Sequence, residues 1–187
     1  MMTRCKTMML NLTEQEMLDL WKLRIGLTQA RRDCTMERED GIDADALLLS
    51  DIRQWYAHTL ALAPTHLLPV EDVAGSVFAD IATDGSITVK LPDNCVRPLC
   101  WHIEGWERDV TTFHSPDSLI AMQQSVKWLR GNEAHPIAVL HDSVLKLYSV
   151  TPGFGGDIDK ALCVVRPADG SYQFGSELIS TFTTSIG

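Results

Sequence analysis

Residues 86–113 constrain the fold more than any other stretch of this sequence. Apolar and polar side chains alternate over residues 86–91, which is the period-two pattern of a strand with one buried face. Pro92, Asp93 and Asn94 then favour a turn, and a second alternating run follows over residues 95–104. The stretch therefore predicts two successive β-strands separated by a tight turn.

The second of these strands contains a proline and is followed by a predicted return strand. Pro98 has no N–H to donate to a neighbouring strand, so we expect an edge strand or a β-bulge at this position. Gly105 turns the chain into the return strand over residues 106–110. We expect Trp101 and Trp106 to supply much of the core beneath this hairpin, because tryptophan buries a large apolar surface.

The sequence before this stretch has helical signals. Thr13 and Glu16 have the spacing of a capping box, which predicts a helix that begins at residue 13. A second helix is expected over residues 44–63, since apolar side chains recur there at helical spacing and Pro64 ends the pattern. We expect the two helices to pack antiparallel.

The sequence after the stretch predicts one more helix and several strands. A Ser-Pro-Asp start at residue 115 predicts a helix over residues 116–129. Its apolar stripe would consist of Leu119, Met122, Val126 and Leu129. The expected strands are residues 136–141, 144–151 and 161–166, and residues 171–185 are strand-like in composition.

Together these patterns predict an α+β protein. An N-terminal antiparallel helix pair, within residues 1–70, is expected to pack on an antiparallel, β-sandwich-like domain of residues 71–187 with an inserted helix at about 116–129. We expect three polar or glycine-rich segments to be mobile in the free protein, because they bury too little apolar surface to offset the entropy of ordering. They are residues 1–10, 31–43 and 152–159.

Composition excludes some classes of protein. The chain has 187 residues, of which 45% are hydrophobic and 22% charged, as in soluble globular domains. No apolar run approaches the roughly 20 residues that span a bilayer, so we expect no membrane association and a cytoplasmic location. The formal net charge is -9, and residues 71–187 carry 8 basic and 15 acidic side chains. Such an acidic region argues against tight binding to a phosphate backbone, and we expect no sequence-specific binding to nucleic acid.

No motif predicts catalytic, cofactor-binding or metal-ligating residues. Cys100 and His102 share a strand face, but Cys95 falls on the opposite face and no second Cys/His pair completes a zinc site. The His-Asp-Ser run at residues 141–143 lies on a predicted turn, where adjacent side chains cannot face one another as in a triad. We therefore expect no zinc and no enzymatic activity. An uncharacterised hydrolase and a cellular protein-binding domain of β-sandwich type stay as alternatives.

One pattern of structural residues points to a known family. It runs through ITVKLPDNCVRPLCWHIEGWERDV at Leu91, Pro92, Asp93, Arg97, Trp106, Arg108 and Val110, and continues with Gln123, Gln124, Gly131 and the run that begins at Pro136. A helix such as residues 44–63 precedes it. This order resembles the head–tail adaptor and tail ring proteins of short-tailed bacteriophages, including phages of Bacteroidetes, and of prophages. The resemblance covers roughly residues 44–150.

The resemblance implies a structural protein of the virion. Copies would assemble in the cytoplasm into a ring that joins portal and tail proteins, and DNA would pass through the ring passively. An acidic lumen would keep the DNA from sticking. We expect Arg97, Arg108 and Phe154 at a partner interface, because the two arginines belong to the family pattern and Phe154 is the aromatic residue of a glycine-rich loop.

Overall fold

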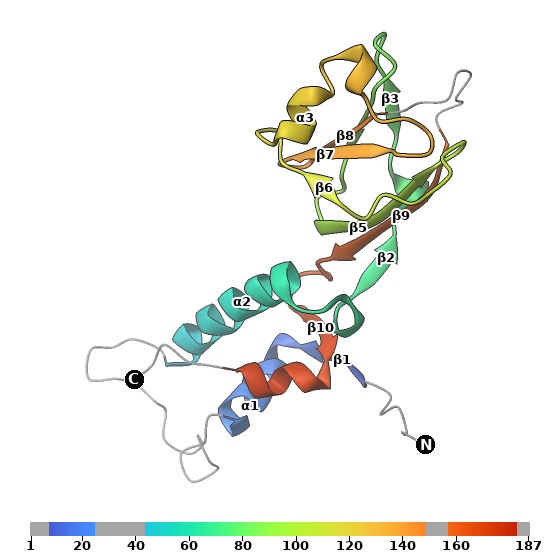
Figure 1. Ribbon diagram of the computed structural model, residues 1–187. Helices are drawn as coiled ribbons and strands as arrows, with labels where there is room; N and C mark the ends of the chain where they lie inside the picture. The colour runs from blue at the N-terminus through green and yellow to red at the C-terminus, as the bar shows by residue number, and fades with distance from the viewer. Residues whose placement is uncertain (1–7, 25–43, 149–156, 183–187) are drawn as a thin grey trace, which may run out of the picture. The chain divides into compact units, whose positions relative to one another are not determined.

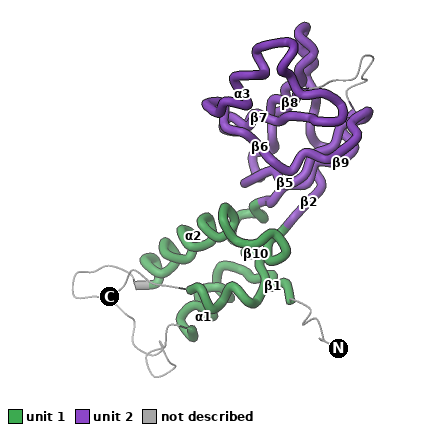
Figure 2. The backbone as a smooth tube through the Cα atoms, viewed as in Figure 1, with its two compact units in different colours: residues 1–69, 166–187 green, residues 70–165 purple. Residues whose placement is uncertain are grey.

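The computed structural model describes residues 8–24, 44–148 and 157–182 (Figure 1). The chain forms two compact units: unit 1 comprises residues 1–69 and 166–187, and unit 2 comprises residues 70–165 (Figure 2). Both units contain helices and strands, so the protein belongs to the α+β class, as predicted. The start of unit 2 coincides with the predicted boundary at residue 70. The assignment of residues 166–187 to the β-rich domain is wrong, because they belong to unit 1.

The described residues of unit 1 form two α-helices, a two-stranded sheet and two 3-10 helices. Its elements are β1 (Met9–Thr13), α1 (Glu14–Arg24), α2 (Ala44–Leu62), η2 (Thr65–Leu67), β10 (Ser171–Gly175) and η5 (Ser176–Thr181). An ion pair of 2.6 Å joins Glu14, at the start of α1, to Arg53 of α2. A second, of 2.7 Å, joins Lys22 near the end of α1 to Asp45 at the start of α2. The two helices therefore run antiparallel, as predicted.

Strand β1 is an element that the sequence did not predict. It pairs antiparallel with β10, so the expected mobility of residues 1–10 is wrong for residues 9 and 10, whereas residues 1–7 lie outside the described residues. The pairing could not be foreseen from a local pattern, because its partner strand is near the other end of the chain. The predicted capping box follows directly, since the Glu16 carboxylate accepts hydrogen bonds of 2.8 Å from the N–H and the hydroxyl of Thr13.

An aromatic cluster forms the core of unit 1. Trp21 of α1 is fully buried and stacks on Phe182, with ring centroids 4.3 Å apart. Trp55 of α2 contacts both Phe182 and Phe174 edge to face. These contacts hold the C-terminal segment in unit 1. They also explain why residues 171–185 are not one continuous strand, because η5 follows β10 and brings Phe182 back to the tryptophans.

Unit 2 consists of two β-sheets and short helices. Its strands are β2 (Val70–Asp72), β3 (Ala79–Ile81), β4 (Ile87–Lys90), β5 (Cys95–Ile103), β6 (Phe113–His114), β7 (Ile137–His141), β8 (Val144–Tyr148) and β9 (Ile158–Val165). The strand orders are β2-β9-β5 and β3-β4-β8-β7-β6. Neighbours are antiparallel except β6 and β7, which are parallel. Side chains of both sheets share one core that includes Trp101 and Trp106, so the predicted role of both tryptophans is confirmed.

Strand β5 has the irregularity that Pro98 predicts. It lies at the edge of the three-stranded sheet, and its register against β9 shifts next to Pro98. The return strand predicted over residues 106–110 is reduced to a single bridge between Trp101 and Val110. Between Trp101 and Val110 the backbone forms a hydrogen bond to another segment: the N–H of Glu107 donates to the carbonyl of Glu133 at 2.9 Å.

The helix predicted over residues 116–129 is wrong in length. Unit 2 has instead the short helix α3 (Leu119–Gln123) and the 3-10 helix η4 (Lys127–Leu129), and no residue of either is buried. Gln124 ends α3, because its side chain donates to the carbonyl of Ile120 and accepts from the N–H of Gly131. The side chain of Gln124 is buried, whereas the apolar side chains of the predicted stripe are exposed.

Candidate protein-interaction surface

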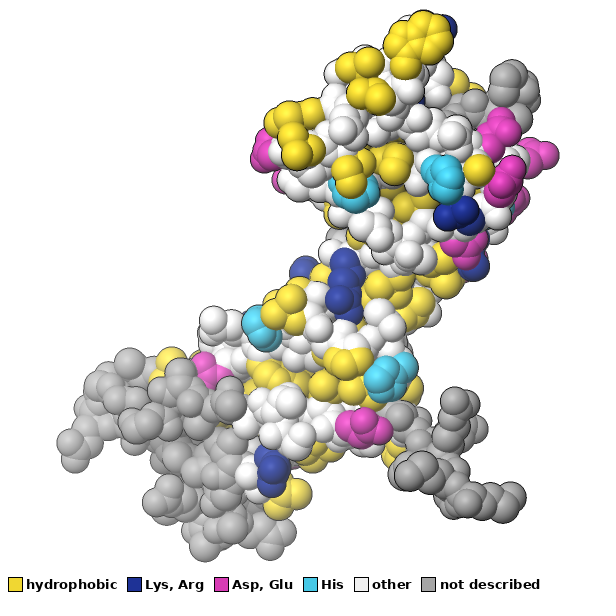
Figure 3. Space-filling view, viewed as in Figure 1, with side chains coloured by type: hydrophobic (Ala, Val, Ile, Leu, Met, Phe, Trp, Pro, Cys, Tyr) yellow, Lys and Arg dark blue, Asp and Glu magenta, His cyan; other side chains and the backbone are white. Residues whose placement is uncertain are grey.

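Large apolar side chains on and between α3 and η4 are exposed. We call them the 119–129 surface, which consists of Leu119, Ile120, Met122, Val126, Trp128 and Leu129. Trp128 is 90% exposed and Leu119 is 77% exposed. Figure 3 shows hydrophobic side chains gathered over this end of unit 2. A group of exposed apolar side chains on one segment is typical of a protein–protein or ligand-binding site.

Arg130 fastens this segment to the larger sheet. Its Nε donates to the carbonyl of Gln124 at 2.7 Å, and its Nη1 donates to the carbonyl of Asp84 at 2.6 Å. Its Nη2 also lies 3.1 Å from the Asp84 carboxylate, in the turn between β3 and β4. At the other end of the segment, Ser118 caps α3 by accepting a hydrogen bond from Ala121. The apolar side chains are therefore presented by a backbone that is held at both ends.

Asp84 is the acceptor that organises this turn. Its carboxylate accepts hydrogen bonds from the hydroxyl of Ser86 at 2.6 Å and from the N–H of Ser86 at 3.0 Å. These bonds, and to a smaller extent the charges of Arg130 and Lys146, lower the pKa of Asp84 to about 2. Asp84 is therefore ionised at neutral pH, and its pair with Arg130 persists there.

A pocket of about 580 Å³ lies beside the 119–129 surface. It is lined by Asp84, Ala121, Met122, Gln124, Ser125, Arg130, Lys146 and Tyr148. The ring of Tyr148 has two cationic neighbours, with the Arg130 guanidinium 5.9 Å and the Lys146 ammonium 5.4 Å from its centroid. Met122 belongs to both the pocket and the 119–129 surface, so cationic and apolar groups meet here.

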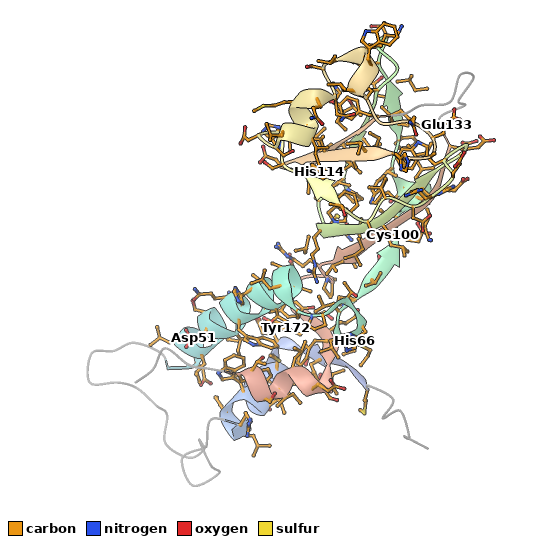
Figure 4. All side chains as sticks on the ribbon, in the orientation of Figure 1. Asp51, His66, Cys100, His114, Glu133 and Tyr172 are labelled. Atoms are coloured by element: carbon orange, nitrogen blue, oxygen red, sulfur yellow. The ribbon has the colours of Figure 1, made fainter. Side chains whose placement is uncertain are left out.

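The strongest candidate for chemistry in unit 2 is a polar cluster around Asp109, next to Cys100 of β5 (Figure 4). The Asp109 carboxylate accepts hydrogen bonds from Lys160 at 2.7 Å and from the thiol of Cys100 at 3.0 Å. His102 Nδ1 lies 3.1 Å from Asp109, within ion-pair distance but not in hydrogen-bond geometry. Burial and the Asp109 carboxylate raise the pKa of Cys100. A thiol with a raised pKa stays protonated and is a poor nucleophile, so the cluster does not favour a nucleophilic site.

The described residues contain neither a cluster of metal ligands nor a membrane-spanning helix. No group of three His, Cys, Asp or Glu side chains among them could hold a metal ion. Cys95 contacts Cys163, whereas Cys100 contacts Asp109. These different partners agree with the prediction that Cys95 and Cys100 lie on opposite faces of the strand. None of the helices in residues 8–24, 44–148 and 157–182 is long and apolar enough to cross a bilayer.

Unit 1 has a groove of about 670 Å³ that is lined by α2, β10 and the segment before β10. Tyr172, labelled in Figure 4, lies on its wall. Polar groups of the groove bond to one another or to the backbone. Arg53 pairs with Glu14, and the hydroxyl of Tyr56 both donates to and accepts from the backbone of Gln173. Burial raises the pKa of Tyr56 to about 12.

Of the three interface residues predicted from the sequence, the structure describes Arg97 and Arg108. Arg97 is half-buried in β5, and Arg108 is exposed in the loop after Trp106. Phe154 lies outside the described residues, as do residues 31–43 and 152–156 of the segments expected to be mobile. Residues 158 and 159 belong to β9, so the expected mobility is wrong for them. One signal could have found the 119–129 surface: Trp128 lies outside the apolar stripe of the helix predicted over residues 116–129.

Comparisons with known proteins do not assign this surface to a family. No protein-family model matches the sequence, and no curated protein or solved structure is significantly similar to it. What the protein does is therefore inferred from its own residues.

Proposed function

We propose that this protein is a structural subunit of the head–tail adaptor or tail ring of a bacteriophage or prophage. It acts by binding portal and tail proteins and further copies of itself, around a channel through which DNA passes. The observation that carries the proposal is the 119–129 surface, on which Trp128 is 90% exposed although the backbone beneath it is held by Arg130. A virion subunit is a protein whose apolar surface becomes covered on assembly.

The energetics of burial support an assembly role. Burying one large apolar side chain contributes about 1.5–3 kcal/mol. Covering a few of the six side chains of the 119–129 surface would therefore supply a substantial part of the binding free energy of a micromolar interface. Tryptophan is enriched among the residues that dominate such interfaces. Because Arg130 and Gln124 hold the segment before docking, little conformational entropy is lost when a partner binds.

Net charge supports passive contact with DNA. Residues 71–187 carry 15 acidic and 8 basic side chains, and Figure 3 shows acidic groups on the exposed face of unit 2. A surface of this sign repels a phosphate backbone, as the wall of a DNA channel requires.

Mixing the purified protein with portal rings of the same phage tests the proposal. We expect co-sedimentation with wild-type protein and its loss in the double variant Trp128→Ser, Leu129→Ser, because both side chains are exposed and would be buried on docking. Leu62→Ser is the matched control, since Leu62 is a leucine of unit 1 that is 66% exposed. Circular dichroism should show that all variants fold.

Two outcomes would contradict the adaptor function: no co-sedimentation of the wild type, or equal co-sedimentation of the double variant. A stable complex with a cellular protein in place of the portal would favour the cellular binding domain. The raised pKa of Cys100 gives no support to the hydrolase alternative.

A further inference from the structure

We propose that the pocket beside the 119–129 surface binds a carboxylate of a partner segment whose neighbouring apolar side chains cover Met122. The partner segment is therefore acidic as well as apolar. This inference deepens the proposed function and rests on it, because it names the kind of segment that docks.

Lys146 is the residue that would favour a negatively charged partner segment. It is half-buried in β8, and its ammonium lies 5.4 Å from the centroid of the Tyr148 ring. In the part of the chain that the structure describes, no ion pair joins Lys146 to a carboxylate. The charge of Lys146 acts on the nearby Asp84 carboxylate, but a partly buried cation that makes no direct ion pair has lost hydration that a carboxylate of a ligand can replace.

The other charges of the pocket leave Lys146 available. Arg130 uses all three of its side-chain nitrogens to bond Gln124 and Asp84. Asp84 in turn is held by Ser86 and Arg130. The ionised side chains that line the pocket are thus two cations and one anion, on a chain whose formal net charge is -9. The pocket is positive where most of the chain is negative, which is the complementarity that a carboxylate needs.

One partner segment can contact both the cationic pocket and the apolar 119–129 surface. Met122 lines the pocket and is also 58% exposed on the 119–129 surface. A carboxylate beside Lys146 therefore places adjacent apolar side chains of the same segment over Met122. Methionine adapts its shape to such contacts. A second copy of this chain, a neutral apolar segment and a basic segment are the competing occupants.

A pair of synthetic peptides tests the charge preference on the full-length protein. Both carry leucines at i, i+3, i+4 and i+7, the spacing of a helix that docks in a groove. One peptide carries glutamates at the flanking positions and the other carries lysines. Fluorescence anisotropy should show that the glutamate peptide binds about tenfold or more tightly than the lysine peptide.

Substitutions locate the effect. Lys146→Glu and Lys146→Met should each weaken the glutamate peptide by about tenfold or more, and the methionine variant keeps the length of the side chain if the glutamate variant does not fold. Lys90→Glu is the matched control, because Lys90 is an exposed lysine of β4 outside the pocket. We expect it to weaken binding by less than about twofold, through long-range charge alone.

Several results would overturn the inference: equal binding of the two peptides, binding of neither, or equal effects of the Lys146 and Lys90 variants. Sedimentation that shows a dimer which Trp128→Ser dissociates would also overturn it, because the occupant would then be a second copy. Portal co-sedimentation that depends on Trp128, with no preference between peptides, contradicts this inference alone. The expected peptide preference without portal binding contradicts the adaptor function alone.

Discussion

At the scale of single residues, the bonds of Asp84 decide how the 119–129 surface is held. The same carboxylate serves Ser86 within its own turn and Arg130 from the segment that carries the surface. Asp84 is exposed, yet it connects a hairpin turn to a candidate binding site. A residue of this kind has no signature in a sequence, since its partners depend on which segments the fold brings together.

The titration of Asp84 gives a prediction at this scale. Its pKa is lowered from 3.8 to about 2 in the folded protein, so ionised Asp84 stabilises the folded state above pH 3.8 and loses this effect as the pH falls toward 2. We expect wild type to have a higher urea midpoint than Asp84→Asn near neutral pH. The difference should shrink as the pH falls below about 4 and should be lost below pH 2, where Asp84 becomes protonated in the folded state as well.

Asp117→Asn is the control for this experiment, because Asp117 is exposed and lies outside the Ser86–Arg130 network. A pH-independent difference between wild type and Asp84→Asn would show that the hydrogen bonds do not depend on the charge of Asp84. Following the Asp84 carboxyl carbon by NMR measures its pKa directly.

At the scale of elements, the turn between β7 and β8 shows a local rule that the sequence predicted correctly. Residues 141–143 were assigned to a turn, and the strands do meet there, with His141 opposite Val144. Asp142 has a φ of 53°, a left-handed conformation that aspartate tolerates better than most residues. In this turn the His141 Nε2 lies 3.7 Å from the Asp142 carboxylate, and both side chains are exposed.

This turn predicts how substitutions at Asp142 affect stability. Asp142→Val should lower the free energy of unfolding by about 1–2 kcal/mol, because a β-branched side chain is strained at positive φ. Asp142→Gly should leave stability unchanged or raise it slightly, since glycine adopts this conformation without strain. Urea denaturation of the two variants measures both effects. Equal destabilisation by valine and glycine would show that the Asp142 carboxylate matters rather than its backbone conformation.

At the scale of the whole molecule, unit 2 is inserted into the chain of unit 1. Its first strand, β2, pairs with its last strand, β9, so that Val70 is the partner of Val164. The chain thus enters and leaves unit 2 on neighbouring strands. Unit 2 has its own core around Trp101, and unit 1 has a separate aromatic core around Trp21.

This arrangement predicts that residues 70–165 fold without unit 1. A fragment of these residues should unfold cooperatively in urea and should keep the near-UV circular dichroism of Trp101 and Trp106, because both rings are buried inside unit 2. Residues 1–165, which lack β10 and η5, are the informative comparison, since Trp21 would lose its contact with Phe182. A non-cooperative transition in the 70–165 fragment would show that unit 2 depends on unit 1.

The sequence by itself determined the elements whose physics is local. Period-two alternation located β4 and β5, Pro64 ended α2, the capping box began α1, and Pro98 marked the irregular edge strand. Each of these features depends on residues that are close in the chain. That is also why the α+β class could be predicted without a structure.

Only the tertiary structure decided the features whose partners are distant in the chain. The pairing of β1 with β10 placed the C-terminal segment in unit 1. The bonds of Arg130 and the buried amide of Gln124 hold a shorter helix than predicted and leave its apolar stripe in the exposed 119–129 surface. An amphipathic pattern shows that a segment has an apolar side, but whether that side is buried depends on which other segments reach it, and in this protein none of the described ones covers Trp128.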